Sequence, residues 1–359
     1  MKSILMVKLS ALGDVIHALC VLDAFKETWP GACVDWVVGE AAAPLLKGHP
    51  MIRRLLVYRR RQLGRDVKNP LGWMRAIREL AALRREIRAV RYDAAVDLQG
   101  LFKSGMIMQM ARADQKVGFA GGREFSSIFL NRKLPPYDPD RHAVDRYLDL
   151  ARFLGAEGRQ VRFPLGISQE DRKGASELLS RYGLEPGTYA VLVPGTVWPT
   201  KHWNSSGFSQ VARKMLDAYG IRSLVVGSGS EADLAQAVSE GSRGAAVSIA
   251  GMTGLKELAA IFESSILAVS VDTGPMHMAV AAGTRVVALF GPTAPWRTGP
   301  YGQGHQVVRR PVSCSPCFKR RCPEPRCMEE ITPEEVMEAV GRVLEKGRFP
   351  GAGGIKQEG

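Results

Sequence analysis

The sequence has no long hydrophobic run, few aromatic residues and few cysteines. Its apolar stretches are about six residues long, far short of the roughly 18 that a membrane-spanning helix needs. Aromatic residues make up 7% of the chain and do not alternate with the arginines, which argues against a base-stacking surface for nucleic acid. Six cysteines in 359 residues exclude a disulfide-rich scaffold. These absences favour a globular protein whose cysteines are thiols or metal ligands.

The N-terminal segment also lacks the apolar core of a signal peptide, because Lys8 and Asp14 interrupt it. We therefore expect a cytoplasmic protein. Hydrophobic residues make up 45% of the chain and charged residues 24%, which is typical of folded proteins. A length of 359 residues exceeds what one core usually serves, so two domains are expected.

Basic residues are in excess, and they are unevenly placed. The net charge is +13, and the segment 53–91 holds thirteen basic residues against three acidic ones. Such a segment attracts nucleic acid, acidic lipid headgroups or phosphorylated sugars, although 75–91 could equally be the solvated face of a helix. Arg59, Arg60 and Arg61 follow a predicted strand, so they are expected on a loop that can carry function.

Short β-branched runs alternate with helical patterns along the whole chain, which predicts α/β domains with parallel sheets. The polar segment 155–164 is the expected boundary. We predict one domain over 1–165, a second over 166–345 and a flexible tail over 346–359. The expected strands cover 4–7, 34–38, 94–98, 189–193, 224–226, 247–249 and 266–271.

Two loops after predicted strands carry candidate functional residues. Asp14 either caps a helix or points its carboxylate into a ligand site. In the segment 266–293, the turn Asp272–Pro275 precedes a helix, and Pro275 suits the first helical position. The N-terminus of that helix would bind phosphate. The alternative is an ordinary βαβ unit in which Asp272 caps the helix.

Several segments together resemble one family, the bacterial lipopolysaccharide heptosyltransferases of glycosyltransferase family 9. The versions DLQGLFKS and FLNRK are more similar to heptosyltransferase I than to heptosyltransferase II. The segments that carry the resemblance are KLSALGDVIH (8–17), DLQGLFKS (97–104), NRK (131–133), HAV (142–144), KHW (201–203) and SVDTGPMH (270–277).

This resemblance implies a GT-B fold, in which two Rossmann-like doubly wound domains face each other across a cleft. The N-terminal domain would bind the acceptor and the C-terminal domain the nucleotide sugar. The implied reaction moves L-glycero-D-manno-heptose from ADP-heptose to a Kdo residue of the lipopolysaccharide inner core, with inversion. No cofactor is implied for this reaction.

The resemblance also implies roles for individual residues. Asp14 would be the general base, and Lys201 would hold the pyrophosphate together with the helix N-terminus, without a metal. Met252 would pack on adenine, or else fill the core. The donor-binding residues would be Thr196, Glu231, Met252, Asp272, Thr273, Gly274, Pro275 and His277. The acceptor-binding residues would be Arg59, Arg60, Arg61, Arg123, His142 and Arg146.

Four cysteines lie close together near the C-terminal end, with the spacing C-x2-C-x4-C-x4-C. Four thiols in so short a span could form a structural zinc site. The spacing matches no standard zinc finger or ribbon, so reduced thiols or a redox-labile loop remain the alternative. These cysteines are Cys314, Cys317, Cys322 and Cys327.

The expected partners are ADP-heptose, a Kdo–lipid A glycolipid and the anionic inner leaflet of the inner membrane, with no nucleic acid. The enzyme would act on the cytoplasmic face of that membrane as a peripheral protein. Two enzymatic alternatives are a heptosyltransferase II-like activity and another GT-B transferase that uses a UDP- or GDP-sugar. A non-enzymatic alternative is an anion- or nucleic-acid-binding protein built on the basic segment 53–91.

Overall fold

The structure is a computed structural model that describes residues 1–59 and 70–345. Two of the predicted acceptor-binding residues, Arg60 and Arg61, lie outside these described residues, as does the predicted tail 346–359. Within the described part of the chain, no helix is both long enough and apolar enough to cross a lipid bilayer.

The chain divides into two compact units. The first is Met1–Lys173, joined by the short segments Gly254–Ala260 and Trp296–Thr298. The second unit contains the rest of the chain. The predicted domain boundary at residue 165 stays a prediction, and the helix α8 (Gln169–Ser180) spans the point at which the first unit gives way to the second.

The first unit contains a parallel six-stranded sheet with the order β3-β2-β1-β4-β5-β6. Its central strand β1 is buried, and Ile4 of β1 pairs with Val34 of β2 and Ala94 of β4. The strands are β1 (Ser3–Val7), β2 (Cys33–Gly39), β3 (Arg54–Tyr58), β4 (Arg91–Asp97), β5 (Arg112–Phe119) and β6 (Arg132–Leu134).

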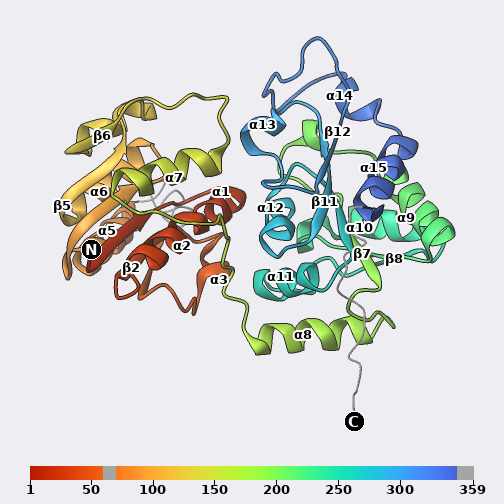
Figure 1. The fold of residues 1–359 in the computed structure, drawn as a ribbon, viewed down its shortest axis with the longest axis horizontal. Helices are drawn as coiled ribbons and strands as arrows, with labels where there is room; N and C mark the ends of the chain where they lie inside the picture. The colour runs from red at the N-terminus through yellow and green to blue at the C-terminus, as the bar shows by residue number, and fades with distance from the viewer. Residues whose placement is uncertain (60–69, 346–359) are drawn as a thin grey trace. The chain divides into compact units, whose positions relative to one another are not determined.

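Helices cover both faces of this sheet (Figure 1). On one face, Leu83 and Ile87 of α5 and Ile107 of α6 form a core with Leu5 and Val7 of β1. The α-helices are α1 (Leu12–His17), α2 (Leu19–Thr28), α3 (Ala43–Leu46), α5 (Pro70–Arg88), α6 (Phe102–Met110) and α7 (Ala143–Phe153). A 3-10 helix, η1 (Arg123–Phe129), lies between β5 and β6 in the chain.

The second unit contains another parallel six-stranded sheet, with the order β12-β11-β10-β7-β8-β9. Its central strands β7 and β10 are fully buried, in agreement with their continuous apolar sequences. The strands are β7 (Tyr189–Val193), β8 (Arg222–Val225), β9 (Ala246–Ser248), β10 (Leu267–Val271), β11 (Arg285–Phe290) and β12 (Gln306–Arg309).

Helices connect these strands as crossovers, as parallel pairing requires (Figure 1). Two short 3-10 helices, η2 (Pro199–Lys201) and η3 (Gly229–Glu231), follow β7 and β8. The α-helices in this part of the chain are α9 (Ser205–Tyr219), α10 (Ala232–Gly241), α11 (Leu255–Glu263), α12 (Gly274–Ala281), α13 (Pro295–Thr298), α14 (Arg326–Glu329) and α15 (Pro333–Glu345). Most of α11 and α13 belongs to the first compact unit.

The two sheets share one topology. If the strands of each are numbered along the chain, both have the order 3-2-1-4-5-6 of a doubly wound nucleotide-binding domain. In such sheets, ligands bind beyond the carboxyl ends of the strands where the order reverses. That point lies between β1 and β4 in the first unit and between β7 and β10 in the second. The predicted fold class, two doubly wound α/β domains, is confirmed.

Candidate active site

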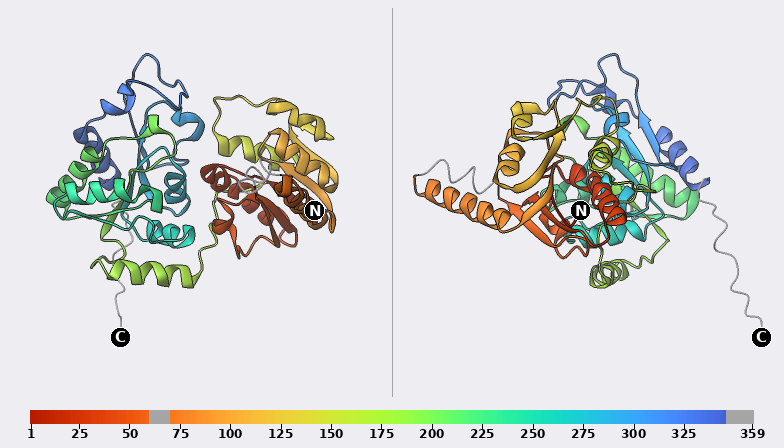
Figure 2. Two further views of the ribbon diagram at one scale, coloured as in Figure 1. Left: turned by 180° about the vertical axis from the view of Figure 1, so that it is seen from behind. Right: turned by 60° about the vertical axis from the view of Figure 1, so that its left-hand side comes forward.

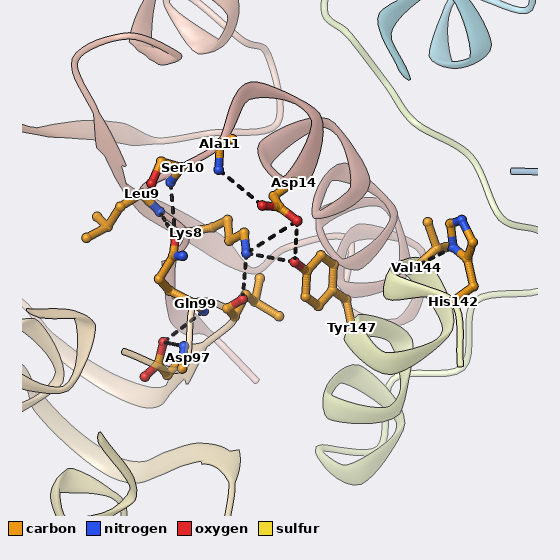
Figure 3. Close-up of polar contacts among 12 residues, drawn as sticks. Lys8, Leu9, Ser10, Ala11, Asp14, Asp97, Gln99, His142, Val144 and Tyr147 are labelled. Atoms are coloured by element: carbon orange, nitrogen blue, oxygen red, sulfur yellow. Dashed lines mark hydrogen bonds and ion pairs between the residues drawn. The ribbon is translucent and has the colours of Figure 1, made fainter. Parts of the chain in front are cut away.

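Asp14 lies on α1, just beyond the carboxyl end of β1, and its carboxylate is held from two sides (Figure 3). Its Oδ2 accepts the backbone N–H of Ala11 at 3.1 Å. Its Oδ1 accepts the hydroxyl of Tyr147 at 3.1 Å. The side chain is still 36% exposed. The carboxylate is therefore both oriented and reachable, as a proton acceptor must be.

Lys8 comes directly after β1, and only 3% of its surface is exposed. Its Nζ donates to the carbonyl oxygen of Leu98 at 3.0 Å and to the hydroxyl oxygen of Tyr147 at 2.7 Å. It lies 3.9 Å from Oδ1 of Asp14. Burial lowers the pKa of Lys8, and the nearby carboxylates of Asp14 and Asp97 counteract this only in part. The buried Lys8 ammonium thus lies beside the Asp14 carboxylate.

Tyr147, on α7, connects the lysine with the carboxylate (Figure 3). Its hydroxyl accepts from Lys8 and donates to Asp14. Burial raises the pKa of Tyr147 well above its ordinary value, and the charge of Asp14 raises it further. The hydroxyl therefore keeps its proton, and it keeps donating to Asp14 over the whole working range of pH.

Side chains at the end of β4 fix the loop that leads to Asp14. The Oε1 of Gln99 accepts the backbone N–H groups of Leu9 and Ser10 at 3.0 and 3.1 Å. The carboxylate of Asp97 in turn accepts the backbone N–H groups of Gln99 and Gly100 at 2.9 and 3.0 Å. The loops after β1 and β4 are thus tied together, which limits the positions that the Asp14 helix can take.

A cavity of about 260 Å³ opens at this point of the first unit. Asp14, Arg123 and Arg146 line it together. The guanidinium of Arg146 lies 4.5 Å from the ring centroid of Tyr137, and its buried Nε has no hydrogen-bond partner among the described residues. One carboxylate with two arginines suits a substrate that carries both a reacting hydroxyl and negative charge.

Two other predicted acceptor residues, Arg59 and His142, lie elsewhere in the first unit. Arg59 lines a separate cavity of about 300 Å³ together with Glu79 and Glu86 of α5. His142 is the N-cap of α7, because its Nδ1 accepts the backbone N–H of Val144 at 3.2 Å. In the described structure, neither Arg59 nor His142 lines the cavity that holds Asp14. Their role in binding the acceptor stays a prediction.

In the second unit, Lys201 and Asp272 form a close ion pair. The Nζ of Lys201 lies 2.6 Å from Oδ2 of Asp272, and the same oxygen accepts the hydroxyl of Thr293 at 2.6 Å. Asp272 is 5% exposed, and the Lys201 ammonium also lies 4.6 Å from the ring centroid of Trp198. The pair brings a cation from the loop after β7 to the end of β10.

The helix α12 begins beside this pair. Its N-cap is Thr273, not Asp272, and the Thr273 side chain makes no capping hydrogen bond. Gly274 is the first helical residue and Pro275 follows it, which agrees with the preference of proline for the first turn. His277, on the same helix, is buried. An N-terminus without a side-chain cap offers backbone N–H groups and a positive dipole end to an anion.

Thr196 and Glu231 lie on the loops that follow β7 and β8. The hydroxyl of Thr196 donates to the backbone carbonyl of Asp272 at 3.3 Å. The Oε2 of Glu231 accepts the N–H and the hydroxyl of Ser228 at 2.7 and 2.8 Å. A Cβ at Gly195 would come within 2.2 Å of the Glu231 carboxylate, so a larger residue there would displace the Glu231 side chain.

Met252 is 56% exposed, and its sulfur accepts the hydroxyl of Tyr182 at 3.4 Å. The alternative that it fills the core is therefore wrong. Its packing on adenine stays a prediction, like the ribose contact of Glu231.

The four C-terminal cysteines are free thiols, and all four line one cavity of about 100 Å³. Burial and the neighbouring thiols raise the pKa of Cys327. Within the described residues, however, no group of three or more His, Cys, Asp or Glu is placed to hold a metal ion. The structure does not support the predicted zinc site at Cys314, Cys317, Cys322 and Cys327.

Sequence reasoning assigned no role to Lys8, Gln99 or Tyr147. Lys8 and Gln99 could have been found, because each is a polar residue directly beyond a buried strand and lies in a segment that carries the resemblance. Tyr147 has no such signal. It is 133 residues from Asp14 along the chain, and only the folded sheet brings α7 beside α1.

Comparisons with known proteins agree with this geometry. A sequence profile described as glycosyltransferase family 9 (heptosyltransferase) matches residues 80–328. Lipopolysaccharide heptosyltransferase 1 of Pseudomonas aeruginosa is 32% identical over 329 residues, covering 89% of this chain and 87% of that protein. The protein of the same name from Escherichia coli K12 is 31% identical, covering 86% and 93%.

Among solved structures, the E. coli heptosyltransferase WaaC with ADP superposes with a TM-score of 0.78 at 27% sequence identity, covering 95% of this chain and 99% of that one. The same enzyme with ADP-2-deoxy-2-fluoro heptose gives a TM-score of 0.75, also at 27% identity, covering 96% and 99%.

Proposed function

This chain belongs to glycosyltransferase family 9, and from that premise we propose that it transfers L-glycero-D-manno-heptose from ADP-heptose to a Kdo residue of the lipopolysaccharide inner core. It is a glycosyltransferase with the GT-B fold of the heptosyltransferases. Relatives named lipopolysaccharide heptosyltransferase 1 support transfer of the first heptose rather than the second. We also place the enzyme on the cytoplasmic face of the inner membrane.

One observation carries the proposal: a reachable carboxylate shares a cavity with two arginines. Asp14 is the proton acceptor, and Arg123 and Arg146 supply positive charge beside it. A Kdo residue carries a carboxylate as well as hydroxyls, so it fits this combination. Arginine is well suited to hold it, because its planar fork donates two parallel hydrogen bonds to one carboxylate.

The transfer is a single displacement. The acceptor hydroxyl oxygen forms a bond to the anomeric carbon of the heptose as its proton passes to Asp14. The bond between that carbon and the β-phosphate oxygen breaks, and its electron pair leaves with ADP. Attack from the face opposite the leaving group inverts the anomeric centre. Proton transfer to Asp14 is favourable in the transition state, because the hydroxyl becomes more acidic as its bond to carbon forms.

The departing ADP gains negative charge, and we assign its stabilisation to the second unit. The Lys201 ammonium and the uncapped N-terminus of α12 supply fixed positive charge. Donors that are already in place cost no reorganisation during the reaction. Since the chain itself supplies this charge, the proposal includes no cofactor. Thr196, Glu231, Met252 and His277 remain the proposed contacts to the rest of the donor.

The test is a mass-spectrometric transfer assay with Kdo2–lipid A and a panel of donors. We expect transfer from ADP-heptose, and no comparable transfer from UDP- or GDP-sugars. Activity only on an acceptor that already carries one heptose would replace the proposal with a heptosyltransferase II-like function. Activity with a UDP- or GDP-sugar alone would overturn the donor assignment. Salt-sensitive binding to DNA without any transfer would favour a nucleic-acid-binding protein instead.

A further inference from the structure

The helix α5 exposes large apolar side chains on one face. Trp73 is 57% exposed, Met74 55% and Ile77 60%. These positions are related as i, i+1 and i+4, so they share one side of the helix. An adjoining side of the helix is used for packing, because Ala76, Leu83 and Ile87 are buried. The apolar residues are therefore not part of the core of the first unit.

The same face of α5 continues as a basic surface. Arg84, Arg85 and Arg88 lie eleven positions after Trp73, Met74 and Ile77, respectively. Eleven residues make about three helical turns, so each arginine lies in line with its apolar counterpart, about 16 Å further along the axis. The acidic residues of the helix, Glu79 and Glu86, lie away from this face and line the Arg59 cavity.

Further exposed apolar residues lie on the neighbouring elements. The helix α6 packs against both α5 and η1, and the right-hand view of Figure 2 shows α5, in orange, at the periphery of the first unit. Phe102 of α6 is exposed, as are Phe125 and Ile128 of η1. The rings of Phe102 and Phe129 lie 5.6 Å apart and join α6 to η1.

Phe125 is in an unusual conformation. Its φ is 59°, in the left-handed region that a bulky side chain rarely adopts, and 78% of its surface is exposed. A left-handed backbone here is strained, and such strain is concentrated at functional sites. The ring of Phe125 is therefore displayed on the surface of η1 and not packed in the core.

We propose that these residues dock the enzyme onto an anionic phospholipid bilayer. We call them the α5–η1 surface: Trp73, Met74, Ile77, Phe102, Phe125 and Ile128. An apolar patch beside a row of arginines matches the boundary between acyl chains and acidic headgroups, whereas a neutral protein partner would not require the arginines. Tryptophan and long basic side chains are both favoured at that boundary.

The position of η1 connects this surface with the reaction. Arg123 and Ser126 of η1 line the cavity that contains Asp14. A bilayer bound at Phe125 and Ile128 would therefore present a lipid-anchored sugar close to the base. This step rests on the proposed function, because it assumes that the acceptor is a glycolipid. Binding of the surface to lipid does not depend on that assumption and is tested separately.

The test is co-sedimentation with vesicles of phosphatidylglycerol and phosphatidylethanolamine, compared with vesicles of phosphatidylcholine alone. We expect wild-type protein to bind the anionic vesicles, and to lose this binding as salt is raised. The variant Trp73→Ser/Ile77→Ser should bind at least tenfold more weakly. Arg84→Gln/Arg85→Gln should also bind more weakly and lose most of the salt dependence. Tyr219→Ser removes a comparably exposed aromatic residue from the second unit and should bind normally.

Turnover separates this inference from the proposed function. Trp73→Ser/Ile77→Ser should lose activity on acceptor embedded in anionic vesicles but retain it on a lipid-free Kdo acceptor. Unchanged vesicle binding by this variant would overturn the docking surface. The docking surface would also be overturned if wild-type protein forms a dimer in solution and the substitutions dissociate this dimer without changing lipid binding. If wild-type protein binds vesicles but transfers heptose to neither acceptor, the proposed function fails and the docking surface stands.

Discussion

The two units have the same sheet topology, yet α1 and α12, which each begin beside the point where the strand order reverses, use their N-termini in opposite ways. In the first unit, Oδ2 of Asp14 accepts the N–H of Ala11, so the chain's own carboxylate occupies the positive end of α1. In the second unit, α12 begins at Thr273 without a side-chain cap in the described structure. One helix end is filled by the protein, and the other is left for a ligand.

The lysine–carboxylate pairs of the two units also differ, in whether the carboxylate or the lysine is the group available to a ligand. Lys8 lies 3.9 Å from Asp14, with the Tyr147 hydroxyl bonded to both, and the carboxylate remains partly exposed. Lys201 touches Asp272 directly at 2.6 Å, and that carboxylate is buried. In the first unit the lysine supports a carboxylate that reacts, and in the second a carboxylate supports a lysine that binds. One topology thus provides a base and an anion site.

Asp14→Asn should have the largest effect. An amide of the same shape cannot accept the proton, so kcat should fall by about 10²- to 10⁴-fold, the usual contribution of a general base. Binding of ADP-heptose, measured by calorimetry, should be unchanged because the donor contacts are assigned to the other unit. Near-normal turnover with intact donor binding would show that Asp14 is not the base.

Lys201→Gln should have the next largest effect, and of a different kind. Loss of a fixed cation at the leaving group should lower kcat by about 10²- to 10³-fold and weaken ADP binding as well. Asp272→Asn should show a milder form of the same result, since Asp272 acts by holding Lys201. If Asp272→Asn lowers kcat but leaves ADP affinity unchanged, the role assigned to Asp272 is wrong, because that pattern is expected of a base.

Much of this arrangement was predictable from the sequence, because motif residues follow buried strands. Asp14, Lys201 and the Asp272–Pro275 turn lie directly beyond or close to strand ends. The N-cap of α12 is Thr273, one residue after the Asp272 that the sequence offered as a cap. The contacts of Arg59 and His142 were not predictable. Whether a loop or cap side chain turns into a given cavity depends on packing between elements that are distant in the sequence.

Tyr147 illustrates that limit and provides the third prediction. Tyr147→Phe keeps the ring but removes the hydroxyl that joins Lys8 to Asp14. We expect kcat to fall about tenfold, the effect of losing one hydrogen bond to a charged group, with donor affinity unchanged. Tyr137→Phe is the matched control, because Tyr137 lines the same cavity without bonding to Asp14. Equal losses in the two variants would show that the bond to Asp14 is not what matters, because Tyr137→Phe also removes a hydroxyl but no bond to Asp14.

In contrast to Asp14, the buried carboxylate of Asp35 on β2 should have no effect on turnover and a clear effect on stability when it is replaced. Its side chain is fully buried, and it accepts hydrogen bonds from Arg53, Arg54 and Tyr92. Burial pushes the pKa of Asp35 upward, but these three donors outweigh burial and hold the pKa below its ordinary value. Asp35→Asn removes the charge that the arginines neutralise, so we expect about 2 kcal/mol less stability at pH 7.

The stabilisation that the charged Asp35 provides should depend on pH. Because the folded-state pKa of Asp35 lies below its ordinary value of 3.8, the unfolded chain takes up the proton first as pH falls. The stabilisation is therefore complete well above pH 3.8 and is lost below it. Denaturant titrations should show the stabilities of wild type and Asp35→Asn converging in acid.

Asp114→Asn, which breaks the exposed pair with Arg91, should cost less than about 1 kcal/mol at any pH. Equal costs for the two variants would mean that burial adds nothing to the Asp35 cluster.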